Sequence, residues 1–284
     1  DSRDPEEMVR ILNRYLEAMT QVIERYAGVI DEFIGDAILT VFGIPEEKTD
    51  DPARAVACAL AMQQTLAGLN QEFVADGLPP LEMGVGINTG PVVVGNLGSE
   101  ARTKYGIVGA VVNVASRIES NTVGGQVLVG ESTHARVNER IEALPPMTVM
   151  MKGLKRPLVC YPVTAIGPPY SVRFAPKTPD LLVEIRLPFQ MWQLDGKKVV
   201  AGPAAGETQR LNASTIVVSV PDAPATLTNV KLLFTFCQEA HCFSDVYAKV
   251  VEVDNTTRPP VCRLHITYMD QADRALLDRW IRAV

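Results

Sequence analysis

The sequence predicts two consecutive folded units, an α+β domain and then a small domain built mostly of β-strands. Residues 1–166 mix helical and strand patterns joined by tight turns, residues 167–180 are rich in proline, and residues 181–284 hold strand patterns and one final helix. The charge balance changes at the same place, from 14 basic and 21 acidic residues to 13 and 12. With 47% hydrophobic residues, the 284-residue chain can build a core in each unit.

The first helix and the hairpin after it have clear sequence signals. Asp4-Pro5-Glu6-Glu7 combines a capping residue, a proline at the first helical position and a glutamate three positions after the cap. Gly28 ends the helix, and strands are predicted at residues 29–34 and 37–42 around a Gly35-Asp36 turn. The helix is predicted to bury one side, because apolar residues recur at helical spacing. These residues are Met8, Ile11, Leu12, Tyr15, Leu16, Met19, Ile23 and Tyr26.

The rest of the first unit alternates less regularly. Asp51 and Pro52 open a second helix, which runs from Ala53 to about Phe73 and is rich in alanine, leucine and methionine. Because hairpins replace a strict strand–helix–strand order, one mainly antiparallel sheet is expected. The further predicted strands are residues 82–88, 91–96, 105–108, 126–129, 147–151 and 159–164, and the further helices are residues 111–120 and 132–140.

The second unit is predicted to be a small β-barrel or sandwich that ends in a helix. Four prolines between Ile166 and Asp180 indicate an extended linker before it. Turn residues separate the strand patterns, which cover residues 181–194, 215–220, 230–237, 243–253 and 261–268, and the helix covers residues 271–284.

Composition excludes some classes of function. The net charge of −6 argues against a nucleic-acid-binding surface. No apolar run approaches the roughly 20 residues of a membrane helix. Five scattered cysteines fit a reducing compartment better than a disulfide framework, so a cytoplasmic location is expected.

The predicted hairpin GVIDEFIGDAILTVFG (residues 28–43) carries Asp31, Glu32 and Asp36 among apolar residues. A carboxylate at the tip of a hairpin suits a protein core poorly, but it is a good hard ligand for Mg²⁺ or Mn²⁺. Three further segments accompany it in order: Ile87–Gly90 with Val93–Asn96, Val112–Arg117 (VNVASR) and Met151–Lys155 (MKGLK). Together, these four segments resemble the motifs of class III nucleotidyl cyclases, the adenylate and guanylate cyclases, over residues 4–166.

The resemblance implies a ferredoxin-like domain that closes the 3′-oxygen of a nucleoside triphosphate onto its α-phosphorus and releases pyrophosphate. Asp36 matches one of two aspartates that hold two Mg²⁺ or Mn²⁺ ions. Asn113 matches the residue that orients the ribose, and Arg117 the residue that stabilises charge in the transition state. Lys152 matches the lysine that binds the terminal phosphates. Family sites form between two cyclase domains, so a homodimer with two symmetric sites is implied.

The base-reading positions depart from the family pattern. Glu32 stands where adenylate cyclases have lysine and guanylate cyclases glutamate, which favours guanine because a carboxylate only accepts hydrogen bonds. Gly106 stands at the second base-reading position, commonly Asp, Thr or Cys, and Ala110 replaces a polar residue. The prevalence of adenylate cyclases in the family favours ATP, whereas Glu32 favours GTP. The sequence therefore leaves both nucleotides as possible substrates.

The family's other metal-binding aspartate lies on a strand before the first helix, and this sequence begins at that helix. The chain is therefore expected to lack the first strand of the domain and to be inactive by itself. The alternative function is a catalytically dead cyclase-like module that binds a nucleotide and dimerises.

The second unit, residues 181–284, faintly resembles a PilZ domain. Arg186-Leu187-Pro188 is similar to the end of the PilZ arginine motif, and Asn212-Ala213-Ser214 is similar to its N-x-S-x-x-G motif. Leu182 replaces the first arginine and Val217 the glycine. Because PilZ domains hold cyclic di-GMP through those arginines, a degenerate domain that does not bind the dinucleotide is expected.

Overall fold

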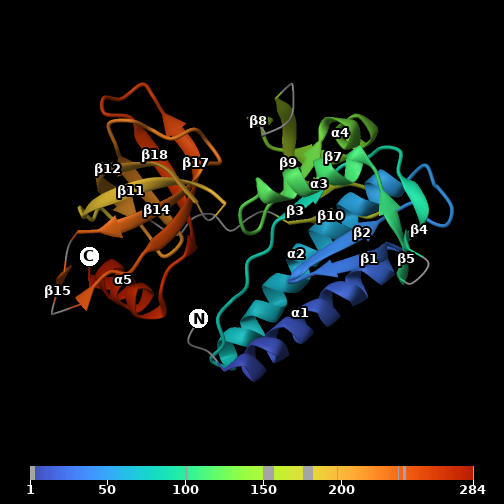
Figure 1. Ribbon diagram of the computed structural model, residues 1–284, viewed down its shortest axis with the longest axis horizontal. Coiled ribbons are helices and arrows are strands. Elements are labelled where there is room, and N and C mark those ends of the chain that lie inside the picture. The colour runs from blue at the N-terminus through green and yellow to red at the C-terminus, as the bar shows by residue number, and fades with distance from the viewer. Residues whose placement is uncertain are drawn as a thin grey trace. The chain divides into compact units, whose positions relative to one another are not determined.

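The computed structural model describes residues 4–99, 102–149, 157–174, 182–196, 198–235, 237–238 and 241–283. The chain forms two compact units, Asp1–Pro176 and Lys177–Val284 (Figure 1). The first unit mixes helices with strands and the second contains a closed six-stranded barrel, so the predicted fold class is confirmed. Among the described residues, no helix combines the length and the apolar character needed to cross a membrane.

The elements of the first unit follow the predicted order, with two additional short strands at residues 141–143 and 172–173. Its helices are α1 (Pro5–Arg25), α2 (Asp51–Ala75), α3 (Ala110–Ser120) and α4 (Glu131–Val137). Its strands are β1 (Val29–Ile34), β2 (Ala37–Val41), β3 (Val85–Ile87), β4 (Val93–Ser99), β5 (Arg102–Val108), β6 (Val127–Gly130), β7 (Ile141–Ala143), β8 (Met147–Val149), β9 (Leu158–Ile166) and β10 (Val172–Arg173).

A central sheet separates two cores in this unit. The sheet runs in the order β10-β9-β6-β3, with β7 and β8 also pairing with β9, and only β3 and β6 are parallel. Helices α1 and α2 lie side by side over one face (Figure 1) and share a core with Val127 and Val129. Leu128 packs instead with Ile118 of α3. Since neighbouring residues of a strand point to opposite faces, β6 is buried on both sides, between α2 and α3.

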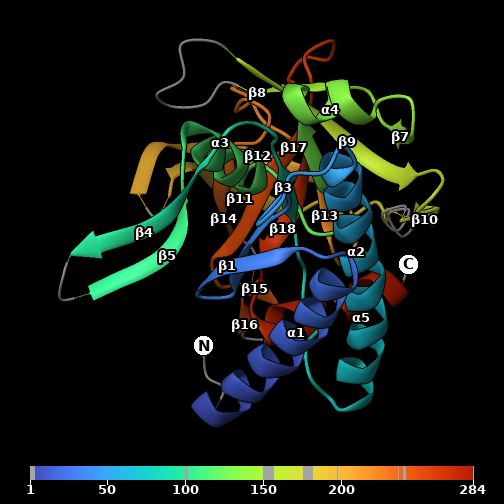
Figure 2. The ribbon, with the colours of Figure 1, turned by 90° about the vertical axis from the view of Figure 1, so that its right-hand side faces the viewer.

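Two hairpins stand apart from the central sheet as separate two-stranded ribbons, β1–β2 and β4–β5. The β4–β5 ribbon extends away from the remainder of the first unit (Figure 2). Both ribbons carry exposed large apolar side chains, which are Val29, Phe33 and Ile34 on β1 and Val93, Tyr105 and Val108 on β4–β5.

The chain that leaves the sheet stays attached to the first unit for several residues. β10 pairs with the end of β9, and the amide of Phe174 donates to the carbonyl of Thr164 at 2.8 Å. The Tyr170 hydroxyl donates to Asp50 at 2.7 Å. The first part of the predicted linker, up to residue 174, therefore packs on the first unit, and the linker boundaries stay a prediction.

The second unit is a closed barrel in the order β11-β12-β13-β18-β17-β14, with helix α5 (Gln271–Ala283) after it. Leu276 and Leu277 of α5 are buried in the barrel core, and Trp280 stacks obliquely on Phe243 with 5.5 Å between ring centroids. The strands are β11 (Pro188–Asp195), β12 (Lys198–Leu211), β13 (Thr215–Ser219), β14 (Asn229–Phe234), β15 (Cys237–Gln238), β16 (His241–Cys242), β17 (Val246–Asp254) and β18 (Val261–Tyr268).

The longest strand of the barrel, β12, was not among the predicted strands. Its sequence contains Gly202, Pro203, Gly206 and several alanines, a composition typical of turns. Barrel packing explains one of these residues. A Cβ atom on Gly206 would lie 2.6 Å from the Phe189 ring and 2.7 Å from the Ser219 carbonyl, so only glycine fits between the neighbouring strands.

Candidate active site

Asp36 lies at the tip of the β1–β2 ribbon. Its turn needs the preceding Gly35, whose φ of +66° is a conformation that other residues rarely adopt. The Asp36 side chain is exposed, and it forms no hydrogen bond or ion pair within the described part of the chain. Burial raises the pKa of Tyr15 on α1 to about 12, and the negative charges of Asp36 and Glu119 contribute to the same shift. The Asp36 carboxylate therefore acts electrostatically on a side chain of the neighbouring helix.

A β-bulge in β1 brings two carboxylates to the same place. Ile30 pairs with Thr40 and Glu32 with Leu39, so Asp31 is an extra residue without a partner position on β2. In a regular strand Asp31 and Glu32 would point to opposite faces, but a bulge changes the direction of side chains. Both carboxylates lie near the ammonium group of Lys104 on β5, with N···O distances of 3.4 Å for Asp31 and 3.1 Å for Glu32.

The three charged groups differ in exposure. The Asp31 side chain is 9% exposed, whereas Glu32 and Lys104 are 48% and 44% exposed. The contacts with Glu32 and Asp31 raise the pKa of Lys104, so it stays protonated. Glu32 and Lys104 thus present one acceptor group and one donor group at a surface, with Asp31 behind them.

Gly106, the second predicted base-reading position, lies on β5 two residues after Lys104 and is buried. A Cβ atom built on it would lie 3.2 Å from Oδ1 of Asp31 and 3.6 Å from the Leu97 side chain. The space in front of Gly106 is therefore occupied by the Asp31 carboxylate. Glu32 and Gly106 are thus linked by two neighbours, since Lys104 contacts both Glu32 and Asp31, and Asp31 lies against Gly106.

Asn113 and Arg117 lie on α3, which rests directly on the backbone of β3. A Cβ atom on Gly86 would lie 2.2 Å from the Glu119 amide nitrogen and 2.8 Å from the Ala115 carbonyl oxygen. No side chain fits at Gly86 without moving the helix. The glycine therefore sets how closely α3 approaches the sheet, and with it the height of Asn113 and Arg117 above the sheet.

The first turn of α3 is held by the residue that follows β3. The Asn88 side chain donates to the Val111 carbonyl at 3.2 Å and accepts from the Ser132 hydroxyl at 2.9 Å. Ser132 belongs to α4, so this amide connects the end of a strand with two helices. A side chain that satisfies both neighbours fixes the start of α3.

The two predicted catalytic side chains are available to a ligand. Asn113 is exposed and Arg117 is partly buried, and four residues separate them on one helix face. Neither side chain forms a hydrogen bond or ion pair with the residues that the structure describes. They lie on a different element from Asp36 and Glu32, and no such contact joins the two pairs among those residues.

The predicted metal and phosphate ligands are only partly visible. Lys152 lies outside the described residues. The exposed Asp36 carboxylate has the hard oxygen donors that Mg²⁺ and Mn²⁺ prefer, so it fits one ligand position. The described residues contain no group of three His, Cys, Asp or Glu side chains that could hold a metal ion. Asp36 alone therefore does not make a complete site.

Lys104, Asp31 and Asn88 received no role from the sequence. For Lys104 a signal was present, because residues two apart on a strand share a face and Lys104 is two before Gly106. The bulge at Asp31 depends on the register of the hairpin, and the double contact of Asn88 depends on residues 23 and 44 positions away, and the sequence pattern indicates neither.

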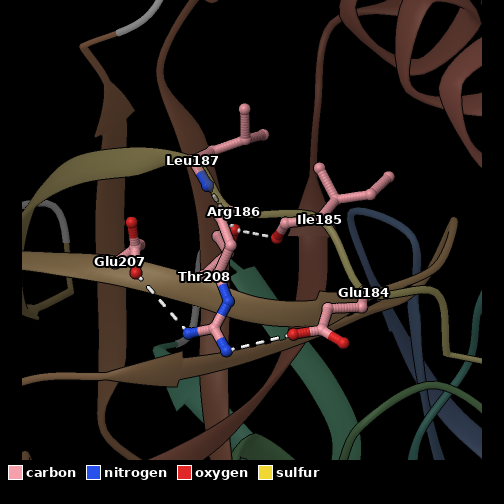
Figure 3. Close-up of polar contacts among 6 residues, drawn as sticks. All are labelled: Glu184, Ile185, Arg186, Leu187, Glu207 and Thr208. Atoms are coloured by element: carbon pink, nitrogen blue, oxygen red, sulfur yellow. Dashed lines mark hydrogen bonds and ion pairs between the residues drawn. The ribbon is translucent and has the colours of Figure 1, made fainter.

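The barrel residues that resemble a PilZ motif have structural partners of their own, and Figure 3 shows those of Arg186. The Arg186 guanidinium lies 3.1 Å from Glu184 and 3.5 Å from Glu207, so two carboxylates balance its charge. Asn212 accepts hydrogen bonds from the amides of Ser214 and Thr215, which closes a turn. A six-stranded barrel is present, whereas its PilZ character and its expected lack of cyclic di-GMP binding stay predictions.

Comparison with known proteins agrees with the geometry of the first unit. Adenylate cyclase 1 of Rhizobium meliloti is 33% identical over 168 residues, which are 58% of this chain and 25% of that protein. The guanylyl cyclase Cya2 is 49% identical at a TM-score of 0.59, covering 61% of this chain and 88% of that structure. The adenylyl cyclase CyaB from P. aeruginosa is 33% identical at a TM-score of 0.56, with coverages of 63% and 88%.

The chain spans about a quarter of the length of the Rhizobium meliloti relative and of Adenylate cyclase of Anabaena cylindrica, to which it is 39% identical over 138 residues. The model of the Adenylate and Guanylate cyclase catalytic domain matches residues 1–165, which make up most of the first unit. The chain therefore belongs to the adenylate and guanylate cyclase family, the family of enzymes that synthesise cyclic nucleotides.

Proposed function

We propose that the protein to which this chain belongs is a guanylate cyclase that converts GTP to 3′,5′-cyclic GMP and pyrophosphate. The observation that carries the proposal is the pairing of half-exposed Glu32 with half-exposed Lys104 at the base-reading position. The 49% identity with the guanylyl cyclase Cya2, against 33% with the adenylyl cyclase CyaB, supports the same choice.

The donor and acceptor pattern of the bases explains the preference. The Watson–Crick edge of guanine presents two N–H donors and the O6 acceptor, and Glu32 can accept from the donors while Lys104 donates to the oxygen. Adenine presents its amino donor and a ring-nitrogen acceptor at the corresponding positions. Placing adenine there would set the acceptor nitrogen against the Glu32 carboxylate, which has no hydrogen to donate.

In the proposed reaction the 3′-oxygen attacks the α-phosphorus, the bond to the pyrophosphate oxygen breaks and the 3′-hydroxyl proton leaves to solvent. Asn113 orients the ribose, Arg117 donates hydrogen bonds to the charge that develops on the phosphate, and Lys152 holds the terminal phosphates. Asp36 would hold Mg²⁺ or Mn²⁺, which when bound activates the attacking oxygen and neutralises the triphosphate.

The active form is proposed to be a homodimer. Asp36 and Glu32 lie on one exposed ribbon, whereas Asn113 and Arg117 lie on a helix seated on the sheet. The ribbons also carry exposed apolar side chains, including Phe33, Ile34 and Tyr105, that a second copy would cover. A two-fold arrangement that joins the ribbon of one copy to α3 of the other creates two equal sites.

The direct test is product formation by the full-length natural protein with GTP or ATP, in Mg²⁺ and in Mn²⁺, analysed by chromatography and mass spectrometry. We expect cyclic GMP as the main product. Asp36→Ala is expected to abolish turnover while the circular dichroism spectrum and the melting temperature stay unchanged, since the side chain is exposed.

Two outcomes would contradict the proposal. A main product of cyclic AMP would refute the guanine preference. A folded full-length protein that binds GTP without making any cyclic nucleotide would indicate the alternative, a nucleotide-binding module without catalysis.

A further inference from the structure

The position in front of Gly106 is filled by a side chain from another strand. Gly106 stands where the family commonly has a base-reading side chain, and glycine has none. The Asp31 carboxylate takes that space, with Oδ1 3.2 Å from where the missing Cβ would be. Asp31 reaches it only because the bulge in β1 turns its side chain to the side of Glu32.

Asp31 also anchors the residue that pairs with the proposed base reader. Its other oxygen, Oδ2, lies 3.4 Å from the Lys104 ammonium, which in turn lies 3.1 Å from Glu32. Lysine side chains at surfaces are mobile, and an exposed ion pair by itself orders them little. A second, nearly buried carboxylate behind the ammonium restrains it, so Lys104 stays beside Glu32 when no nucleotide is bound.

We propose that Asp31 is a specificity-determining positioning residue, which replaces the side chain absent at Gly106 and holds Lys104 so that the Glu32–Lys104 pair faces the base as one acceptor and one donor. The proposal rests on the proposed guanine selectivity. Asp31 acts through Lys104, whereas Glu32 and Lys104 contact the base.

The charge balance supports this assignment. One ammonium between two carboxylates leaves a net negative charge, which suits the two N–H donors of guanine. Without Asp31, Lys104 would keep only its exposed contact with Glu32 and would turn more freely into solvent. The Glu32–Lys104 pair would then be less fixed, and discrimination between guanine and adenine would decrease.

The test measures kcat/KM for GTP and for ATP in the full-length protein, because a merely structural role would lower both values together. We expect Asp31→Ala to reduce the GTP-to-ATP ratio by about tenfold, the effect of losing one pocket interaction. In the double variant Asp31→Ala/Gly106→Asp the carboxylate returns to the same space from β5, and the ratio should recover. Glu46→Ala, which removes an exposed carboxylate from the loop after β2, is the control and should leave the ratio unchanged.

A second variant covers the case in which Asp31→Ala does not fold. Gly106→Ala places a Cβ atom 3.2 Å from Asp31 Oδ1 and pushes the carboxylate away from Lys104 without adding a polar group, so it should lower the ratio as well. Unchanged GTP-to-ATP ratios in the folded variants would overturn the proposed role of Asp31 and would leave the proposed function standing. A wild-type protein that prefers ATP would overturn the proposed function instead, so the two failures are distinguishable.

Discussion

Helix α3 and the two ribbons carry different halves of the candidate site, and they are built in opposite ways. Helix α3 lies against β3 at a distance fixed by Gly86, and Asn88 holds its first turn. The β1–β2 and β4–β5 ribbons lie outside the central sheet and expose apolar residues such as Phe33 and Tyr105. The α3 half of the proposed site is therefore packed closely within one copy, whereas the ribbon half exposes apolar residues.

This difference has a consequence for assembly. One side of the β1–β2 ribbon packs on the core of the first unit through Ile30, Ile38 and Phe42, but the exposed apolar residues of both ribbons favour contact with another surface. A second copy can supply that surface and bring its own α3 to the ribbon. The geometry of the base-reading side chains is then sensitive to assembly, while that of Asn113 and Arg117 depends on the packing of one chain.

The largest effect on selectivity is expected from Glu32→Lys on the ribbon. Lysine only donates hydrogen bonds, so the variant should prefer ATP, with the GTP-to-ATP ratio of kcat/KM falling about 100-fold. Glu47→Lys introduces the same charge change on the exposed loop after β2 and serves as the control. An unchanged ratio in Glu32→Lys would mean that the base is read elsewhere or by the backbone.

A smaller effect, on stability, is expected where α3 meets the sheet. Gly86→Ala places a methyl group 2.2 Å from the Glu119 nitrogen, so the helix must shift, at a cost of about 1–3 kcal/mol in the free energy of unfolding. Gly95→Ala on the β4–β5 ribbon is the matched control, because a Cβ atom there meets nothing within 4 Å.

Urea unfolding of both glycine variants measures this difference. Equal stabilities of Gly86→Ala and Gly95→Ala would contradict the contrast between a packed helix seat and an open ribbon.

The smallest effect is expected at the contact of Tyr170 with Asp50, which belongs to neither half of the site. Burial and the hydrogen bond to Asp50 raise the pKa of Tyr170 to about 12, and the hydrogen bond from Tyr170 lowers the pKa of Asp50. Tyr170→Phe removes this hydrogen bond and should cost about 1 kcal/mol at pH 7, without changing the GTP-to-ATP ratio.

The pH dependence of that difference follows from the two shifts. The Asp50 contribution is present above its unfolded pKa of about 4 and is lost as the pH falls through its lower folded value. The Tyr170 contribution is complete below its unfolded pKa of about 10 and is lost as the pH rises through about 12. Urea unfolding of the wild type and of Tyr170→Phe at pH 3, 7 and 11 would measure how the stability difference between them depends on pH. A stability difference that is the same at all three pH values would contradict this account.

Local sequence patterns predicted the helices and most of the strands, because capping residues, glycines and apolar periodicity act over a few residues. Asp4 caps α1 as expected, accepting from the Glu6 amide at 3.2 Å. Strand β12 was missed because glycine, proline and alanine have low strand propensity, whereas Gly206 is required by the close packing of the neighbouring strands.

The candidate site divides in the same way. Asp36, Asn113 and Arg117 were identified by resemblance to ordered motifs, and their roles stay predictions. Asp31 was present in the same hairpin, but its direction depends on a bulge that pairs Glu32 with Leu39. Its partner Lys104 is 73 residues away in the sequence, a distance that no local pattern covers.

The central claim is that the ribbon of one copy and α3 of another form each site, and mixed dimers test it most directly. Asp36→Ala damages only the ribbon half and Arg117→Ala only the α3 half. Each full-length variant alone should lose at least about 100-fold in kcat, because Arg117→Ala removes a donor that stabilises developing charge and Asp36→Ala removes a metal ligand.

When the two variants are co-expressed with different affinity tags, each purified heterodimer contains one site with both lesions and one site with neither. The account predicts recovery of up to about half of the wild-type activity per heterodimer, because one of two symmetric sites is intact. Verified heterodimers that stay as inactive as the single variants would contradict the shared site.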